Sequence, residues 1–192
     1  MTQILGISGS LRGGSYNTAL LYAAASFSLP DLQLETATLH GIPLYDGDLE
    51  DQEGLPQAVV RLKERIIANQ GLLLVTPEYN NSIPGVFKNA VDWLSRPPQE
   101  VTAVFGGRPV AVIGASPGNF GTLLAQNAWW PVLRTLGTIP WFEGRLLVSR
   151  ASQAFDAQGQ LNDAAIREKL EQFLRGFAAF VEKIKASPRS GE

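Results

Sequence analysis

The fold is decided by residues 4–17, which read ILGISGSLRGGSYN. Residues 4–8 predict a strand, the glycine- and serine-rich residues after them predict a loop, and a helix is expected from about Asn17 to Phe27. A strand that passes through such a loop into a helix is the repeating unit of parallel, doubly wound sheets. This stretch therefore predicts an α/β fold with a binding loop at its first turn.

The same alternation of short apolar runs and amphipathic stretches continues along the chain. Further strands are predicted at residues 32–39, 71–76, 109–115 and within 141–149, and further helices at about 55–69, 84–94, 120–136 and 163–185. Residues 71–76 (GLLLVT) are apolar throughout, as in a strand covered on both faces. The pattern predicts a flavodoxin-like α/β fold with a doubly wound, five-stranded parallel sheet, helices on both faces, and ligands beyond the carboxyl ends of the strands.

The chain shows no internal repeat and no linker. We predict one domain over residues 1–186 and a disordered tail over 187–192. No run of apolar residues reaches the length that spans a bilayer, and the N-terminus lacks the basic start of a signal peptide, so a cytoplasmic protein without membrane contact is expected.

Composition excludes several classes of site. The chain has no cysteine, which removes disulfides, thiolate metal sites and cysteine nucleophiles. A net charge of −2 argues against nucleic-acid binding, which usually requires a basic surface. It also argues mildly against an electron-carrier protein, because such a protein docks to its partners through a strong electrostatic field of one sign. No cluster of metal ligands is present, and the single histidine, His40, is expected in a surface loop.

The first loop has the chemistry of an anion site. Ser10 and Ser15 offer hydroxyl donors and Arg12 offers charge, at a helix N-terminus where backbone N–H groups lack partners. The glycine spacing fits neither a P-loop nor a dinucleotide fingerprint, and a hydroxyl-rich loop suits a terminal phosphate. The alternative is a simple turn in which Ser15 or Asn17 caps the helix.

Two further loops carry a resemblance to a known family. Residues 76–97 (TPEYNNSIPGVFKNAVDWLSRP) closely resemble the signature of the NADPH-dependent FMN reductase family, whose members include quinone, chromate and azo reductases. Residues 9–17 resemble its phosphate motif, and residues 114–122 (GASPGNFGT) resemble its third flavin loop. The three segments occur in the family's order, each after a predicted strand.

The resemblance implies an FMN cofactor and assigns residues to it. Its phosphate would lie on the first loop, and its ring on the second and third. The residues assigned are Ser10, Arg12, Ser15, Asn17, Pro77, Glu78, Tyr79, Asn80, Ser116 and Gly118. For Glu78 the alternative is a structural carboxylate that accepts backbone N–H bonds, and Ser82 is expected to cap the following helix.

The implied function is an FMN-dependent NAD(P)H oxidoreductase. Electrons would pass from NADPH or NADH to a small acceptor, such as a quinone, free flavin, an azo compound or a metal oxyanion, by a ping-pong mechanism. The flavin carries the chemistry, so no catalytic acid or base is assigned. The alternatives are an electron carrier without turnover, a flavin-free relative that binds another phosphate ligand or a partner protein, and an enzyme that releases FMN as a substrate.

The resemblance also implies a homodimer or homotetramer. Trp129, Trp130 and Trp141 cluster in the helix at 120–136 and the strand after it, where core packing is the default. Adjacent Trp129 and Trp130 cannot both face one side of a helix, so one of them is expected at a subunit contact or the acceptor pocket. On the helix before them, Lys88–Asp92 and Asp92–Arg96 have the spacing of exposed ion pairs.

Overall fold

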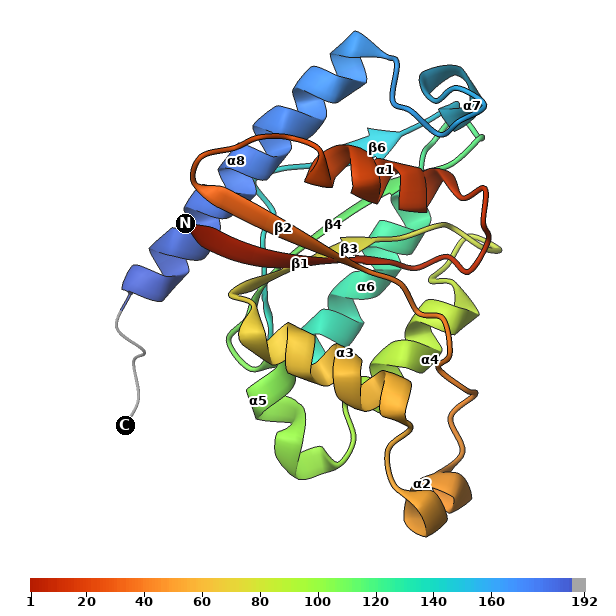
Figure 1. Cartoon of the computed structure of the whole chain (residues 1–192), viewed down its shortest axis with the longest axis vertical. Coiled ribbons are helices and arrows are strands. Elements are labelled where there is room, and N and C mark those ends of the chain that lie inside the picture. The colour runs from red at the N-terminus through yellow and green to blue at the C-terminus, as the bar shows by residue number, and fades with distance from the viewer. Residues whose placement is uncertain (188–192) are drawn as a thin grey trace.

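A parallel sheet runs through the middle of the protein, as Figure 1 shows for a computed structural model that describes residues 1–187. The order of its strands is β2-β1-β3-β4-β5, and β6 also pairs with β4. The strands are β1 (Thr2–Ser8), β2 (Leu32–Ala37), β3 (Gly71–Val75), β4 (Pro109–Ala115), β5 (Ile139–Pro140) and β6 (Leu146–Val148). The chain leaves β1 in one direction for β2 and in the other for β3, which confirms the doubly wound arrangement.

The fifth position of the sheet is divided between two short strands. β5 pairs with the start of β4, and β6 pairs with its end. The strand predicted within 141–149 is therefore only β6, and β5 lies before that range. Between them the chain bends around the Trp141 ring, so closely that a Cβ on Gly144 would come 2.2 Å from it.

Helices cover both faces of the sheet (Figure 1). On one face α1 (Tyr16–Ala25) and α8 (Ala164–Ala186) pack over Ile4, Leu73 and Ile113. On the other, α3 (Gln57–Ala68), α4 (Gly85–Leu94), α5 (Val101–Phe105) and α6 (Leu123–Thr135) pack over Leu5, Leu72 and Val110. Neighbouring residues of β1, β3 and β4 thus face opposite cores, which explains why these strands read as continuous apolar runs.

Four short helices were not predicted. They are α2 (Gly47–Glu53), the 3-10 helix η1 (Pro98–Glu100), α5 and α7 (Ala151–Ala154). In α2 no residue is buried, so there is no apolar periodicity to detect; Asp46 starts it by accepting the Asp48 N–H at 2.9 Å. Capping and tertiary contacts, rather than pattern, account for such segments.

The tryptophans lie in two separate cores. Trp93 and Trp129 are fully buried with α3 to α6, whereas Trp141 packs against Phe173 and Phe177 of α8 on the opposite face. Core packing, the default for these residues, is confirmed for Trp129 and Trp141, but the sheet lies between the two side chains, so they do not cluster in space. Trp129 is fully buried and Trp130 is half-buried against the same core. A subunit contact or acceptor pocket at Trp130 stays a prediction.

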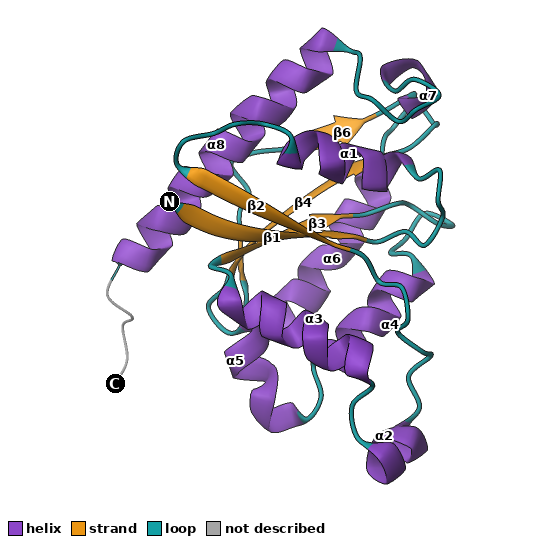
Figure 2. Cartoon of the chain, viewed as in Figure 1, coloured by secondary structure: helices purple, strands orange, loops and turns teal. Residues whose placement is uncertain are grey.

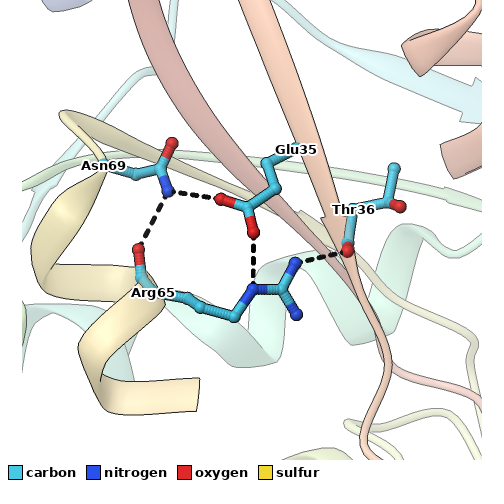
Figure 3. A network of polar contacts seen from close by, with 4 residues as sticks. All are labelled: Glu35, Thr36, Arg65 and Asn69. Carbon is cyan, nitrogen blue, oxygen red and sulfur yellow. Dashed lines mark hydrogen bonds and ion pairs between the residues drawn. The ribbon is translucent and has the colours of Figure 1, made fainter. Parts of the chain in front are cut away.

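A polar network fastens α3 to the edge strand β2 (Figure 3). Arg65 donates to Glu35 at 2.6 Å and to the Thr36 carbonyl at 2.6 Å, and Asn69 donates to the other oxygen of Glu35 at 2.9 Å. Burial raises the pKa of Glu35, but the hydrogen bonds from Asn69 and Arg65 outweigh it, so the net pKa lies below the ordinary value.

The predicted ion pairs of α4 are half confirmed. Lys88 and Asp92 pair at 2.7 Å, but the Asp92–Arg96 pair is wrong. The helix ends at Leu94, so the i, i+4 geometry does not extend to Arg96, whose guanidinium instead lies over the Tyr45 ring at 5.3 Å.

Helix α8 ends at Ala186 and Ser187 follows it in extended conformation, while the rest of the predicted tail, 188–192, lies outside the described residues. The boundary of the domain at 186 stays a prediction. Within residues 1–187, no helix combines the length and the apolar character that a membrane crossing requires.

Candidate functional site

Three loops meet at one edge of the sheet, where the strands end (Figure 2). Loop 1 (residues 9–15) follows β1, loop 2 (76–84) follows β3, and loop 3 (116–122) follows β4. These strands are neighbours and parallel, so their loops come together. The first residue of loop 1 and of loop 2 is bonded to the neighbouring strand: the Gly9 N–H donates to the Val75 carbonyl of β3 at 2.9 Å, and the Thr76 N–H donates to the Ile113 carbonyl of β4 at 2.8 Å.

Loop 1 presents unused donors. Ser15 caps α1 by accepting the N–H groups of Asn17 and Thr18. Within residues 1–187 the N–H groups of Gly13 and Gly14 meet no acceptor, and the exposed Arg12 side chain has no partner. Free N–H groups at a helix N-terminus, beside a cation, favour an anion there.

Asn17 connects α1 to the start of loop 3. Its side chain is buried, its Nδ2 donates to the Ala115 carbonyl at 2.8 Å, and its Oδ1 accepts the Ala115 N–H at 2.9 Å. Ala115 ends β4, two strands away from β1. This pair of bonds sets the position of the α1 N-terminus relative to loop 3.

Loop 2 is built on a two-residue hairpin. Tyr79 and Ser82 exchange backbone hydrogen bonds at 3.2 and 3.1 Å, and Asn80 and Asn81 between them have φ of 50° and 61°. Both central residues are left-handed, as a type I′ turn requires, and asparagine tolerates this conformation. Ser82 is held in the hairpin, and α4 starts after Pro84 without a side-chain cap, so the predicted Ser82 cap is wrong.

Glu78 crosses from loop 2 to the start of α6. Its Oε2 accepts the N–H groups of Leu124 and Ala125 at 2.8 and 3.0 Å. Thr122, which precedes the helix, makes no side-chain cap bond of its own. The structural role considered for Glu78 is thus present, with the difference that it caps another helix and not its own turn.

Loop 3 is held by Arg150, the second residue after β6. Ser116 Oγ accepts the Gly118 N–H at 3.1 Å, and the Gly118 carbonyl accepts the N–H of Arg150 at 2.9 Å. Arg150 also donates from its side chain to Asn119 at 3.0 Å, and its own φ is 49°. The sequence carries no local sign of this contact, because Arg150 is far from loop 3 along the chain.

A tightly packed layer lies beneath loops 2 and 3. A Cβ on Gly114 would come within 2.2 Å of the Thr76 carbonyl and 2.1 Å of Thr122 Oγ1. Trp129 donates from its indole to Thr76 Oγ1 at 3.2 Å, and its ring meets that of Phe87 edge-on at 4.8 Å. Only glycine allows this approach, and the layer keeps the two loops at a constant separation.

His40 contacts loop 1 from the side. Its side chain is exposed, as predicted, and its two ring nitrogens lie 3.1 Å from the Leu11 carbonyl and 3.2 Å from Thr38 Oγ1. Among the described residues, no group of histidine, aspartate and glutamate side chains is arranged to hold a metal ion.

Comparison with known proteins identifies relatives along almost the whole chain. A family model described as NADPH-dependent FMN reductase matches residues 2–153. An NAD(P)H-dependent FMN reductase of Pseudomonas aeruginosa is 45% identical, over 95% of this chain and 97% of its own. A quinone reductase of Escherichia coli is 33% identical, over 95% and 97%. Among solved structures, the flavoenzyme NAD(P)H:(acceptor) oxidoreductase FerB of Paracoccus denitrificans superimposes with a TM-score of 0.84 at 33% identity, covering 95% of this chain and 98% of its own.

Proposed function

The chain belongs to the NADPH-dependent FMN reductase family, and from this we propose that loops 1, 2 and 3 hold FMN and that the protein passes two electrons from NAD(P)H to a small oxidised acceptor. The observation that carries the proposal is the meeting of the three loops at one sheet edge, with free N–H donors and Arg12 on the first. When bound, FMN supplies a ring that accepts a hydride and releases two electrons, and the protein supplies binding and orientation.

The phosphate end fits loop 1. Ser10 and Ser15 use their oxygens to accept backbone N–H groups, so their hydroxyl protons remain for a phosphate oxygen. The free Gly13 and Gly14 N–H groups and the Arg12 guanidinium complete a set of donors suited to a dianion. Asn17 contributes by fixing the loop through Ala115.

The ring end fits loops 2 and 3. Pro77 and Glu78 fix the backbone, the Tyr79 ring is 48% exposed and offers a flat apolar wall, and the Asn80 N–H meets no acceptor within residues 1–187. On the opposite loop, Ser116 Oγ accepts the Gly118 N–H and keeps its own proton for a ring oxygen or nitrogen.

We infer a ping-pong order, in which the nicotinamide leaves one shared site before the acceptor enters it. The relatives named FMN reductase and quinone reductase favour a quinone or free flavin as acceptor, with azo compounds and metal oxyanions as further candidates. Solvent can protonate the reduced product, so the lack of a catalytic acid among the assigned residues is no obstacle.

Anaerobic titration of the FMN-loaded protein with NADPH and with NADH tests the proposal. We expect stoichiometric bleaching of the flavin absorbance, and parallel-line kinetics when donor and acceptor are both varied. Bound FMN that neither donor reduces would favour the electron carrier, and failure to bind FMN would favour the flavin-free relative. Retention of the yellow colour through gel filtration separates a prosthetic group from a released substrate.

We also propose a homodimer or homotetramer in the cytoplasm. A groove of about 370 Å³ between α4 and α6 is lined by Val91, Pro131, Val132 and other residues, and its lining offers apolar surface to a second copy. Trp130 is half-buried beside Phe142, which is 67% exposed. Sedimentation velocity tests the assembly, and cell fractionation tests the location.

A further inference from the structure

A cavity of about 970 Å³ opens beside loop 1, away from loops 2 and 3. Its walls are the loop 1 residues 12–15, the outer flank of α1, the turn at residues 156–162 that follows α7, and Arg167 of α8. Figure 1 shows the chain between α7 and α8 on the same face of the sheet as α1. The cleft borders the phosphate end of the proposed FMN site, since Arg12 and Ser15 line it, but none of the residues assigned to the flavin ring does.

Besides Arg12, which is assigned to the FMN phosphate, the cleft is lined by one further arginine. Within residues 1–187 the Arg167 side chain contacts only the Phe27 ring, 4.6 Å from its guanidinium carbon. Asp156 is the only carboxylate among the lining residues described, and its oxygens accept from Gln158, Gln160 and Asn162 at 2.8–3.0 Å. These bonds, chiefly that from the Gln160 N–H, lower the pKa of Asp156. They also hold its carboxylate toward the backbone of its own turn.

The part of the cleft wall formed by Gly13 and Gly14 carries no side chains. A Cβ on Gly13 or Gly14 would meet no atom within 4 Å, and neither residue has a left-handed φ. Neither packing nor backbone strain therefore requires glycine at these two positions. The missing side chains leave room on the side of loop 1 that lines the cleft.

Aromatic surface lines the α1 flank. The Tyr22 ring is 54% exposed, and the Tyr16 ring is held in place by Phe155, with ring centroids 5.8 Å apart. Exposed tyrosine faces stack on bases, and guanidinium groups bind phosphate with paired hydrogen bonds. With Arg12 assigned to the FMN phosphate, the flat apolar wall and the Arg167 guanidinium together match a phosphorylated nucleoside.

We propose that this cleft binds a nucleoside phosphomonoester, whose phosphate is held by Arg167 and whose base packs on the tyrosine flank. Two sources carry this chemistry. One is the 2′-phosphoadenosine end of NADPH, a reading that rests on the proposed function and would make the cleft a determinant of NADPH over NADH. The other is a free nucleotide that binds beside the active site.

Calorimetric titration of the FMN-loaded protein with adenosine 2′,5′-bisphosphate tests the site. Arg167→Gln removes the charge, and Gln160→Glu adds a carboxylate to the lining of the cleft and leaves Arg167 and Phe27 unchanged. The matched control is Arg175→Gln, on the same helix but paired with Glu171 at 2.7 Å and outside the cleft. We expect the bisphosphate to bind wild type, and both cleft variants to weaken it about tenfold, or about 1.4 kcal/mol, while the control binds normally. Thermal unfolding checks that all variants are folded.

Steady-state kinetics separates the two sources. A tenfold rise in KM for NADPH in Arg167→Gln, with KM for NADH and kcat unchanged, assigns the cleft to the donor. Weakened bisphosphate binding with both KM values unchanged assigns it to a separate nucleotide. Absence of binding to wild type, or equal binding to wild type and both cleft variants, overturns the inference. The calorimetry does not depend on turnover, so a protein that bound the bisphosphate but oxidised neither donor would refute the proposed function alone.

Discussion

Replacement of Glu78 by alanine should destabilise the protein through α6, a helix to which Glu78 does not belong. The change removes the acceptor of two N–H groups, those of Leu124 and Ala125, and a negative charge at a helix N-terminus. A lost cap costs about 0.5–2 kcal/mol and hydrogen bonds to charged groups contribute about 1.5–3 kcal/mol. Because these bonds lie partly exposed, we expect a loss of about 1–2 kcal/mol in the free energy of unfolding.

Urea denaturation of the FMN-free protein measures this loss, with the m-value as a check that the unfolding transition is unchanged. Glu78→Gln keeps an oxygen acceptor and loses only the charge, so it should lose about half as much as the alanine variant. The control is Glu143→Ala, an exposed loop carboxylate with no partner among the described residues, which should change stability by less than about 0.5 kcal/mol. A Glu78→Ala protein as stable as this control would refute the capping role.

Three further changes test other contacts of the site and the sheet. Asn17→Ala leaves the N–H and carbonyl of Ala115 buried without partners and should cost about 2–4 kcal/mol in urea denaturation; a loss below about 1 kcal/mol would contradict the bridging role. Gly114→Ala overpacks the layer beneath loops 2 and 3 and should cost about 1–3 kcal/mol, whereas its control Gly13→Ala, in open space, should leave the thermal midpoint unchanged. Glu35→Gln should cost about 0.5–1 kcal/mol at pH 7. Since the folded pKa of Glu35 lies below the ordinary value of 4.5, its contribution is present above pH 4.5 and is lost as pH falls through the folded value, so wild type and variant should converge in acid; a gap independent of pH would argue against the ion pair.

The parts of the protein that could be predicted from its sequence are those whose causes are local. Apolar runs of β1, β3 and β4 and the stripe of α8 are patterns within one element, and each indicated its element correctly. The donors of loop 1 are equally local, since Ser10, Arg12 and the glycines all lie between one strand and one helix. The strand within 141–149 was located only in part, because Trp141 turns away from the sheet to pack on α8.

What only the tertiary structure decided is which residues meet across the sheet. The sequence predicts Asn17 as a phosphate ligand or a helix cap, yet its side chain forms hydrogen bonds with the Ala115 backbone, because the start of α1 lies beside the end of β4. Glu78 caps a helix that begins 45 positions later, at Leu123, and Arg150, which lies after β6, binds the backbone of loop 3. Such partners depend on strand order, and strand order is a property of the whole core. The sequence by itself therefore determined the fold class and the chemistry of each loop, and the packed sheet determined how the three loops are held together.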